Sequence, residues 1–549
     1  MADVLAAPRT TRMGLVLSAS AAGTVFEWYD FFIFGSLLSI ITKHFFAGAG
    51  EAQGYIFALL TFAVGFAVRP LGALVFGYFG DRVGRKRAFL FTITIMGLAT
   101  FAIGLLPDTN TLGDMAPYIL IGLRMLQGFA VGGEYGGAAI YVAEHAERKK
   151  RGAATGWIQV AATIGLFLAL SIILVLRTVL GEDVFADWGW RIPFLVSLGL
   201  LGISIWIRLK LDESPAFRQL QLAGRTSRAP LSEAFLRWGN LRVVLVVLAG
   251  LMMGQGVVWY TAQFYTQFFL ERVVKVEPRM VNLLILTVTV LSGFLHILFA
   301  RVSDRIGRKP VMLFGLALAV VTLIPGFQWL TEAVNPALSE ATARAPVTVF
   351  AAPTECSLQF DLVGKAKFTS SCDIAKSTLA NLGVPYRNET AEPGNLAQIR
   401  IGTVTLSSID GSVLAPSALK VAQKNFAAEV QSSLTAAGYP ARADTGRINV
   451  PLALAILLVF VTAAAALYGP QAAALVELFP TRIRYSALSL PYHVGVGWFG
   501  GFLPAIAFAI VAATGNLYAG LWYPVTIAGI GFVVTLLFLP ETAGRDIND

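Results

Sequence analysis

Five ionisable residues interrupt stretches of the sequence that are otherwise apolar. They are Glu27, Asp30, Arg69, Arg124 and Glu134. Charged side chains in an apolar interior are costly and mark functional positions more often than chance placements. A carboxyl group there can take up and release a proton, and a guanidinium group can bind a carboxylate through two parallel hydrogen bonds. These residue types therefore favour proton transfer combined with anion binding.

The spacing of the five residues predicts shared helix faces. Glu27 and Asp30 are three residues apart, and Arg124 and Glu134 are ten apart, close to three helical turns. We expect all of these side chains to face one cavity. Our hypothesis is that Asp30, with Glu27 or Glu134, carries a coupling proton. Arg69 or Arg124 would pair in turn with the carboxylate and with a substrate anion. A static network of buried ion pairs is the alternative.

Hydrogen-bonding side chains in a later apolar stretch form a second group of candidates. They recur at about one-turn spacing, which indicates one face of a helix: Gln255, Trp259, Tyr260 and Gln263. We expect this face to bind substrate together with Tyr29. Four residues near the C-terminus could join it: Tyr468, Gln471, Tyr492 and His493. Packing in the core is the alternative for the aromatic side chains, and we expect no role for His44 or His296.

The composition places all of these residues in a membrane. The 549 residues are 56% hydrophobic and 14% charged, with a mean hydropathy of +0.68, well outside the range of soluble domains. A spanning helix needs about 20 apolar residues. We expect an all-α membrane protein with twelve such helices, at about 14–42, 54–79, 88–107, 115–142, 153–178, 190–210, 241–270, 280–300, 310–331, 449–470, 485–512 and 519–539. The first stretch is too long and too charged for a cleaved signal peptide.

Basic residues gather on alternate loops between the apolar stretches. The clusters lie at Arg9 and Arg12, 85–87, 148–151, 208–242, 305–309, and Arg482 with Arg484. The positive-inside rule places these loops in the cytoplasm. We therefore expect a protein of the bacterial inner membrane with both termini on the cytoplasmic side. The net charge of +9 forms no basic stripe, which argues against nucleic acid as a partner. The expected partners are the lipid bilayer and a small-molecule substrate.

One loop sequence occurs twice. GDRVGRKR at 80–87 returns as SDRIGRKP at 303–310, an offset of 223 between Asp81 and Asp304. The glycines permit a tight turn, and the aspartate can pair with the basic residues and with a neighbouring helix end. We expect a gating latch at the inner surface, formed by Gly80, Asp81, Arg82, Gly84, Arg85, Lys86, Asp304, Arg305, Gly307, Arg308 and Lys309. The repeat predicts two six-helix halves.

A weaker echo pairs Arg151 with Arg484 at an offset of 333. The difference of 110 between the two offsets predicts an insertion between helices 9 and 10. The segment 335–447 supplies it, with strand-like runs VTVFA and IRIGTVTLSS and an amphipathic stretch at 417–437, so we expect a small α+β domain outside the cytoplasm. The expected divisions are 1–211 and 212–240 (first half and linker), 241–334, 335–447 (insertion) and 448–549.

The insertion contains the two cysteines of the chain, Cys356 and Cys372. An oxidising compartment would let them form a disulfide, and two unpaired thiols are the alternative. A sequon at 388–390 could accept a glycan only in a eukaryotic secretory pathway. The insertion could control access to the cavity, bind a partner, or do neither.

Long segments resemble the metabolite:proton symporter family of the major facilitator superfamily. They are EWYDFFIFG, RPLGALVFGYFGDRVGRK, RMLQGFAVGGEYGGA, DWGWRIPF and LDESPAF, and the resemblance covers all twelve expected helices but not the insertion. It implies a major facilitator fold and proton-coupled uptake, by alternating access, of substrates such as α-ketoglutarate, citrate, shikimate, proline or betaine. In such a protein Glu134 would belong to the central cavity or to its support.

The arginines favour an organic acid as the substrate, and a zwitterionic osmolyte is the alternative. A membrane receptor that uses the insertion as its sensor is the alternative of another class. No nucleotide-binding, metal-ligand or nucleophile motif indicates an enzyme. We therefore expect no cofactor besides the coupling proton, no metal, and a monomer as the superfamily default.

Overall fold

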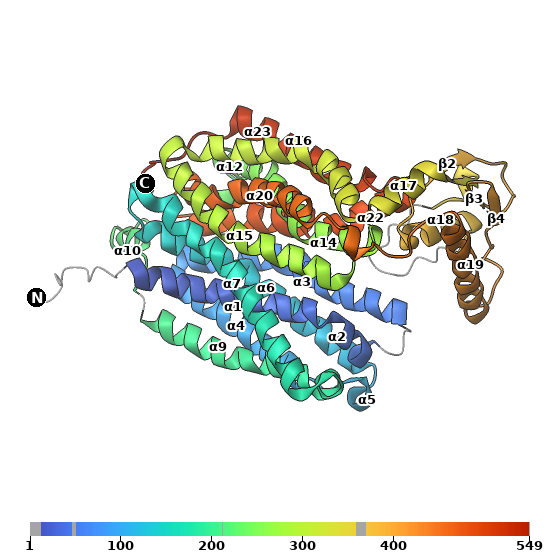
Figure 1. Cartoon of the computed structure of the whole chain (residues 1–549). Helices are drawn as coiled ribbons and strands as arrows, with labels where there is room; N and C mark the ends of the chain where they lie inside the picture. The colour runs from blue at the N-terminus through green and yellow to red at the C-terminus, as the bar shows by residue number, and fades with distance from the viewer. Residues whose placement is uncertain (1–12, 47–50, 211, 358–368, 548–549) are drawn as a thin grey trace, which may run out of the picture.

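The computed structural model describes residues 13–46, 51–210, 212–357 and 369–547 (Figure 1). Within these residues ten helices are long and apolar enough to cross a membrane, and the count is eleven if the bent pair α1 and α2 forms one span. The first half contains α1 (Met13–Ser36), α2 (Leu38–Phe45), α3 (Glu51–Arg82), α4 (Arg85–Leu105), α6 (Met115–His145), α7 (Arg151–Leu180) and α9 (Arg191–Leu209). The single helix expected at 14–42 is therefore broken at Leu37.

The second half is built from helices of similar length. Four are single helices: α15 (Pro278–Ile306), α16 (Arg308–Val334), α20 (Val450–Leu478) and α23 (Trp522–Phe538). Two are composite: the span Trp238–Val273 includes α12 (Trp238–Val246), α13 (Met253–Tyr260) and α14 (Thr266–Phe268), and the span Arg484–Thr514 includes α21 (Arg484–Tyr492) and α22 (Leu503–Thr514). We name the two composite helices the α13 span and the α22 span. Short helices α10 (Pro215–Leu222) and α11 (Pro230–Phe235) join the halves.

Glycines let α3 and α6 approach so closely that only hydrogen fits between their backbones. A Cβ at Gly128 would lie 2.1 Å from the carbonyl oxygen of Gly65, and one at Gly132 would lie 2.3 Å from that of Arg69. Small residues at such crossings are typical of helix packing in lipid. The crossing holds Arg69 of α3 beside Arg124 of α6, so the glycines position the charged residues of the site.

The two halves meet along two helix pairs, α7 with α15 and α3 with α21. Glycines again allow the approach, because a Cβ at Gly156 would lie 2.7 Å from the Ala300 Cβ and one at Gly77 would lie 2.8 Å from the Ser486 Cα. Small residues leave smooth surfaces at these contacts. Such surfaces are suited to rocking of one half against the other.

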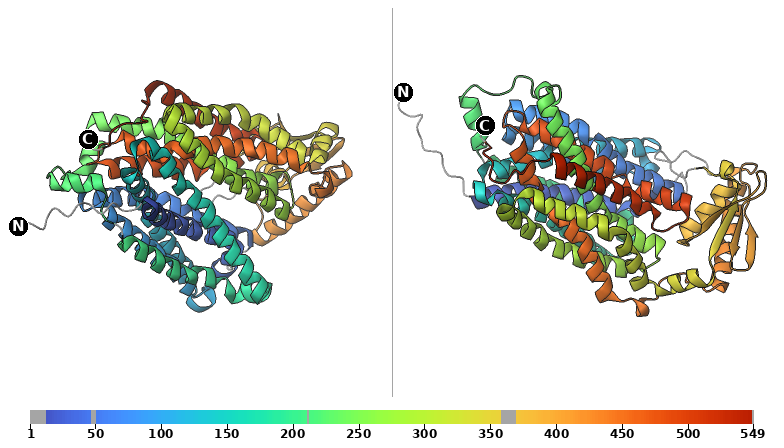
Figure 2. Two further views of the ribbon diagram at one scale, coloured as in Figure 1. Left: turned by 60° about the vertical axis from the view of Figure 1, so that its left-hand side comes forward. Right: turned by 90° about the horizontal axis from the view of Figure 1, so that it is seen from above.

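A separate α+β unit projects from one end of the helix bundle, opposite the end where α10 lies (Figures 1 and 2). We name these the insertion end and the linker end. The unit contains α17 (Pro336–Arg344), β1 (Val347–Ala351), α18 (Ser371–Leu382), β2 (Arg387–Thr390), β3 (Gln398–Ile401), β4 (Val404–Ser407) and α19 (Pro416–Ala436). Its sheet has the order β2-β1-β3-β4, parallel between β1 and β2 and antiparallel elsewhere.

The strands predicted from VTVFA and IRIGTVTLSS and the amphipathic helix at 417–437 are confirmed as β1, the β3–β4 hairpin and α19. Val347 and Val349 of β1 and Ile399 and Ile401 of β3 are buried, as expected for a half-covered sheet. The sequence reasoning missed α18 and β2. Asn388 of the sequon lies on β2 and donates to the Thr514 carbonyl, 2.9 Å away.

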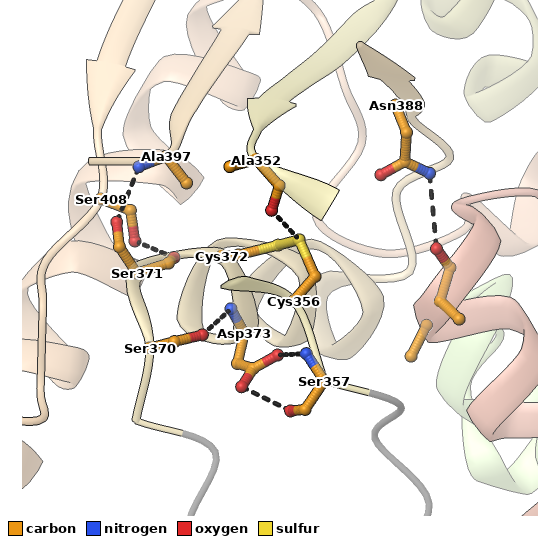
Figure 3. Close-up of a disulfide and its surroundings, with 12 residues drawn as sticks. Ala352, Cys356, Ser357, Ser370, Ser371, Cys372, Asp373, Asn388, Ala397 and Ser408 are labelled. Atoms are coloured by element: carbon orange, nitrogen blue, oxygen red, sulfur yellow. Dashed lines mark hydrogen bonds between the residues drawn. A yellow bond between two sulfur atoms is a disulfide. The ribbon is translucent and has the colours of Figure 1, made fainter. Parts of the chain in front are cut away.

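Cys356 and Cys372 form a disulfide (Figure 3). The bond joins the segment after β1 to the first turn of α18. Asp373 supports the same junction, because its carboxylate accepts bonds from the Ser357 amide at 2.9 Å and the Ser357 hydroxyl at 2.6 Å. The alternative of two free thiols is wrong.

We predict that Cys356→Ser/Cys372→Ser loosens α18 without affecting the bundle. The cysteines are 16 residues apart, and closing a loop of this length contributes about 3 kcal/mol on chain-entropy grounds. Amide hydrogen exchange should therefore accelerate in β1 and α18 and stay unchanged in α6. Equal exchange in α18 of both proteins would show that the disulfide stabilises nothing there.

Candidate functional site

A cavity lies between the helices of the first half, and four of the five intramembrane charges line it. Its walls include Glu27, Asp30, Phe31, Gly65, Phe66, Arg69, Arg124, Gln127, Gly128 and Val131. The centre of a water molecule can move within a volume of about 20 Å³ in this cavity. About 10–15 Å³ measured in this way is enough to hold one water molecule. The conformation is therefore too closed to hold a substrate of several carbon atoms.

Glu27 and Arg69 face this cavity without a hydrogen-bond or ion-pair partner among the side chains that the structure describes. The two charges interact through space but lie beyond ion-pair distance. Arg69 rests on the Phe66 ring, 4.4 Å from its centroid. A second part of the cavity is lined by both residues together with Trp28, Phe31 and Tyr260.

Asp30 and Arg124 are connected through Gln127. The Gln127 amide nitrogen donates to Asp30 Oδ2 at 2.8 Å and to the Thr100 hydroxyl at 2.9 Å. The Gln127 amide oxygen accepts from Arg124 Nη1 at 2.9 Å. The second oxygen of Asp30 is buried and has no hydrogen-bond partner. Gln127 was missed from sequence, although its position three residues after Arg124 puts both on one helix face.

Glu134 does not line this cavity, contrary to the expectation from its spacing to Arg124. Its carboxylate is fully buried and accepts from Arg208 Nη2 at 2.7 Å and from the Thr92 hydroxyl at 3.0 Å. Arg208 also lies over the Phe89 ring, 3.4 Å from the centroid. The sequence places Arg208 in the cytoplasmic basic cluster at 208–242. The structure instead buries it at the end of α9, so Glu134 belongs to the support of the site.

Three other expected substrate contacts do not line the cavity. The Tyr29 hydroxyl donates to the Pro193 carbonyl at 2.7 Å and lies in an apolar cluster with α9. Gln263 accepts from the Thr289 hydroxyl of α15 at 3.0 Å. Gln255 is buried, and neither polar atom of its side chain has a hydrogen-bond partner in the described structure. The helical spacing misled for Gln263 because this residue lies in a π-helical turn at 261–265, which changes the face of the α13 span. Gln255 shares the regular helix α13 with Trp259 and Tyr260, so the π-helical turns do not explain its position.

Trp259 and Tyr260 do meet the first half at the cavity. The Trp259 ring lies 5.3 Å from Trp28, and Tyr260 lies 6.0 Å from Phe66. Phe264 approaches Phe31 at 6.0 Å. These aromatic contacts between helices α1, α3 and α13 cover the cavity on the side of the second half.

A layer of tyrosine and glutamine side chains joins the halves close to the cavity. Tyr135 of α6 stacks on Tyr492 of α21 with ring centroids 3.8 Å apart and planes 4° apart. The Tyr135 hydroxyl accepts from Gln159 at 3.3 Å and from Gln471 at 3.1 Å. Tyr492 in turn lies 3.2 Å, oxygen to oxygen, from Tyr468. Two of the four C-terminal candidates, Gln471 and Tyr492, therefore contact the first half, and Tyr468 lies behind Tyr492.

The histidines occupy different surroundings. His493 is buried, and its Nε2 has no hydrogen-bond partner among the described residues. His296, for which we expect no role, lies beside the polar layer, because its ring is 5.6 Å from that of Tyr468. Its Nδ1 lies 2.6 Å from the Ser292 carbonyl oxygen. His44 pairs with Asp108 at 3.5 Å near the insertion end of α2.

The first copy of the repeated loop links the halves at the linker end. Asp81 pairs with Arg85 at 2.7 Å. Its carboxylate also accepts from the backbone amides of Tyr485 and Ser486 at 3.1 and 2.8 Å, which belong to the first turn of α21. A carboxylate at a helix N-terminus satisfies donors that have no partner inside the helix. Arg85 additionally donates to the Thr481 carbonyl at 2.6 Å.

The second copy repeats this arrangement in the opposite direction. Asp304 pairs with Arg308 at 2.7 Å and accepts from the amides of Gly152 and Ala153 at 2.8 and 2.7 Å. Those amides begin α7 of the first half. Gly84 and Gly307 have φ values of 135° and 104°, conformations that favour glycine. Of the latch residues, Arg82 donates to the Tyr78 hydroxyl of its own helix, and Arg305 is exposed.

Two distant glutamates complete the latch and were missed from sequence. Glu213 accepts from the Arg85 amide at 3.1 Å, and Glu541 accepts from the Arg308 amide at 2.8 Å. The lysines follow the same symmetry, since Lys86 donates to Leu209 and Lys309 donates to Leu536. The signal lies in the short echo of LDES at 211–214 and LPET at 539–542.

Backbone amides stabilise the ionised form of Glu541. Burial alone would raise the pKa of this carboxyl group, but amide donors from Ala543, Arg308, Lys309 and Thr542 hold the pKa below its usual value. A lowered pKa in the folded state means that the stabilisation is present at neutral pH and is lost as the pH falls.

Two ion pairs cross directly between the halves at the same end. Arg484 of α21 pairs with Glu144 of α6 at 2.5 Å, and Arg151 of α7 pairs with Glu477 of α20 at 2.8 Å. Both pairs are buried, and they relate Arg151 to Arg484 as the sequence echo predicted. Among the described residues, all ion pairs between the two halves lie at the linker end.

The fold and the duplicated latch define a transporter of the major facilitator superfamily. Among solved structures, that of the proton:xylose symporter XylE of Escherichia coli matches with a TM-score of 0.65 over 98% of each chain, at 15% sequence identity. An identity this low shows a shared fold only.

The chain belongs to the sugar (and other) transporter family, whose sequence profile matches residues 15–234 and 432–549, and within it to the metabolite:proton symporter family. The resemblance found from sequence is thereby confirmed, and the described helices are those of a multi-pass membrane protein.

Curated relatives differ in the substrate that their names state. The shikimate transporter of Escherichia coli is 37% identical over 56% of this chain and 70% of its own length. The glycine betaine/proline/ectoine/pipecolic acid transporter OusA of Dickeya dadantii is 28% identical over 98% of this chain and 85% of its own. The proline/betaine transporter of Escherichia coli is 35% identical over 57% of this chain. The match covers 63% of the length of that relative.

We predict that Glu134 and Arg208 depend on each other for stability. Removing one partner of a buried ion pair costs about 3–5 kcal/mol, whereas replacing both costs much less. Arg208→Met and Glu134→Gln should each lower the unfolding free energy in mixed micelles, and the double variant should lose less than the sum. Glu182→Gln is the control, because its pair with Arg177 is exposed and should contribute less than about 1 kcal/mol. Additive losses would contradict the pairing.

Proposed function

We propose that this transporter couples proton movement to the uptake of a small organic acid. The observation that carries the proposal is the cavity in which Arg69 and Glu27 face each other without a partner. Uncompensated charges within a membrane are costly, so a ligand is the expected partner. A substrate carboxylate would bind Arg69, and a proton taken up by a second carboxyl group of the cavity would offset the added negative charge.

The linker end faces the cytoplasm in this proposal. The basic loops at 85–87, 148–151 and 305–309 gather at that end, as the positive-inside rule requires. The bundle then has twelve spans, because α3 and the joined α1 and α2 are added to the ten described ones. Both termini lie in the cytoplasm of a bacterium, the insertion lies outside, and the transporter works as a monomer with no cofactor besides the proton.

Asp30 is the proposed site of the coupling proton. Its Oδ2 accepts from Gln127, which also holds Arg124, and its buried Oδ1 has no hydrogen-bond partner. A proton on Oδ1 would remove the negative charge that holds Arg124 through the amide. Arg124 could then turn toward the substrate carboxylate. Proton uptake and acid binding would thereby favour each other.

The linker-end contacts define the gate that must open to release substrate inside. Asp81 and Asp304 each hold the N-terminus of a helix in the other half, and the stacked Tyr135 and Tyr492 lie between those contacts and the cavity. Opening would require both latch copies and this stack to separate. Alternating access by rocking of the halves meets that requirement.

A zwitterionic osmolyte is the second candidate substrate, because aromatic rings surround one side of the cavity. Trp28, Trp259 and Tyr260 stand near Glu27, and aromatic faces bind quaternary ammonium groups. The names of two relatives include betaine and proline. A receptor function is not favoured, since the latch contacts between halves would then have no use.

The direct test is a proteoliposome assay that records internal pH while citrate, shikimate, proline or glycine betaine is added outside. We predict internal acidification with one of the acids. Asp30→Asn should abolish the acidification while the protein stays folded, because the amide has no proton to carry at this site. Asp108→Asn, which lies on the surface near His44, is the matched control. Undiminished proton movement in Asp30→Asn would exclude this residue as the coupling site.

Substitutions of Arg69 and Trp259 distinguish the two substrate classes. If the substrate is an acid, Arg69→Gln should weaken its binding by roughly tenfold or more, the value of one charge-assisted bond of about 1.5–3 kcal/mol, and Trp259→Leu should have a small effect. If the substrate is a zwitterion with a quaternary ammonium group, Trp259→Leu should weaken binding comparably. Competition between radiolabelled shikimate and betaine measures both. No effect of Arg69→Gln on either compound would reject the proposed anion site.

A further inference from the structure

The inserted unit contacts the tips of two membrane helices at the insertion end. These tips are the end of the α13 span, at Val273, and the end of the α22 span, at Thr514. The two helices are far apart in sequence but pack side by side, since a Cβ at Gly500 would lie 2.5 Å from the Tyr260 ring. The insertion thus touches both members of one helix pair.

The tip of the α13 span is held by α18 and by the end of the insertion. The Lys275 ammonium donates to the Asn381 carbonyl at 2.6 Å, and the Lys275 carbonyl accepts from the Ala443 amide at 3.0 Å. Gly383 lies so close that a Cβ there would stand 2.1 Å from the Val273 oxygen. Lys275 has a φ of 61°, the one positive value of a non-glycine residue in the described chain. The contact therefore imposes an unfavourable backbone conformation on the turn.

The tip of the α22 span is held by the segment that leads into β2. The Tyr386 amide donates to the Gly515 carbonyl at 2.9 Å, and its hydroxyl donates to the Ala512 carbonyl. Asn388 donates to the Thr514 carbonyl at 2.9 Å (Figure 3). The Ala512 and Thr514 carbonyl groups belong to the last helical turn and have no partner inside the helix, and Gly515 directly follows that turn. The insertion therefore caps this helix.

One short stretch of chain makes both contacts. Asn381 and Gly383 touch the first tip, and Tyr386 and Asn388 touch the second, so eight residues bridge the two helices. The stretch is fixed at both ends, since it follows α18 and continues into β2, which pairs with β1. The disulfide ties the other end of α18 to the segment that follows β1. A flexible link between the tips is thus excluded.

Both helices have irregular turns between these tips and the cavity. π-Helical segments occupy 261–265 and 269–273 in the α13 span and 493–500 in the α22 span. Such segments weaken the regular hydrogen-bond ladder and often occur where helices bend for function. Trp259 and Tyr260 of the α13 span cover the cavity. Movement of the tips would therefore open or close its cover.

We propose that the inserted domain is a brace that fastens the tips of the α13 and α22 spans together, so that they move as one unit when the cavity opens at the insertion end. The proposal rests on alternating access in the proposed function. The brace makes the opening of the outer side a concerted movement of two helices. From the sequence, the insertion could control access to the cavity, bind a partner, or do neither. The brace gives it a mechanical role in the opening of the cavity.

Distances between spin labels on the two helices test the brace in the absence of any substrate or proton gradient. Labels are attached at Arg272→Cys and Ala505→Cys, exposed positions on the two spans, and the native cysteines stay protected by their disulfide. We expect one narrow distance distribution in the parent protein. Tyr386→Phe/Asn388→Ala, which removes two side-chain hydrogen bonds to the α22 tip, should broaden the distribution roughly twofold.

Two further proteins make the result decisive. Lys424→Ala on the exposed side of α19 is the matched control and should leave the distribution narrow. Replacement of residues 337–446 by a short linker removes the brace entirely and should give the broadest distribution. An unchanged narrow distribution in the deletion protein, with the parent's thermal stability, would overturn the brace. Because no transport is measured, this failure would leave the proposed symport function untouched.

Discussion

The cost of leaving a charge unpaired in an apolar membrane governs most of this structure. Glu134 is neutralised by Arg208, Asp81 by Arg85 and the start of α21, and Glu477 by Arg151 and Arg308. Glu144 and Glu233, two further buried carboxylates of the described structure, are paired with Arg484 and Arg482. The cavity charges Glu27 and Arg69 stand apart from this pattern, and their separation is what gives the cavity its chemistry.

The two ends of the bundle are controlled by different physical means. At the linker end the halves are joined by ion pairs and by carboxylates on helix N-termini, interactions that water can replace when the halves separate. At the insertion end the described contacts between halves are aromatic, and the additional restraint comes from a folded domain. Internal symmetry explains the first end, because each half supplies one aspartate and one helix. The insertion breaks that symmetry at the second end.

Much of the fold was predictable from sequence because its signals are local and repeated. The length of the apolar stretches located the membrane spans, and the loop sequence that occurs at 80–87 and again at 303–310 located the two halves. The difference between the two repeat offsets located the inserted segment. The site was predictable in part. Glu27, Asp30, Arg69 and Arg124 could be recognised because charges are rare in lipid, and all four line the cavity.

The other residues of the site could not be placed from sequence, because their positions depend on which faces of the packed helices meet. Spacing places Glu134 and Arg124 on one face, but only packing shows that α9 brings Arg208 to Glu134. Tyr29 faces α9 and not the cavity for the same reason. A π-helical turn changed the face on which Gln263 lies, and no residue pattern indicated that turn. Glu213 and Glu541 contact the latch from more than 120 positions away in sequence, which helical periodicity has no means to predict.

The central claim is that a proton and a substrate anion bind in one cavity and that each favours the binding of the other. It is tested most directly by measuring protons taken up when the substrate binds to the purified protein in weakly buffered detergent solution. The account predicts uptake of about one proton per bound substrate, because binding and protonation are thermodynamically linked. Asp30→Asn should bind the substrate with no proton uptake. Saturable binding to the parent protein without any proton uptake, across the pH range in which it is stable, would contradict the account.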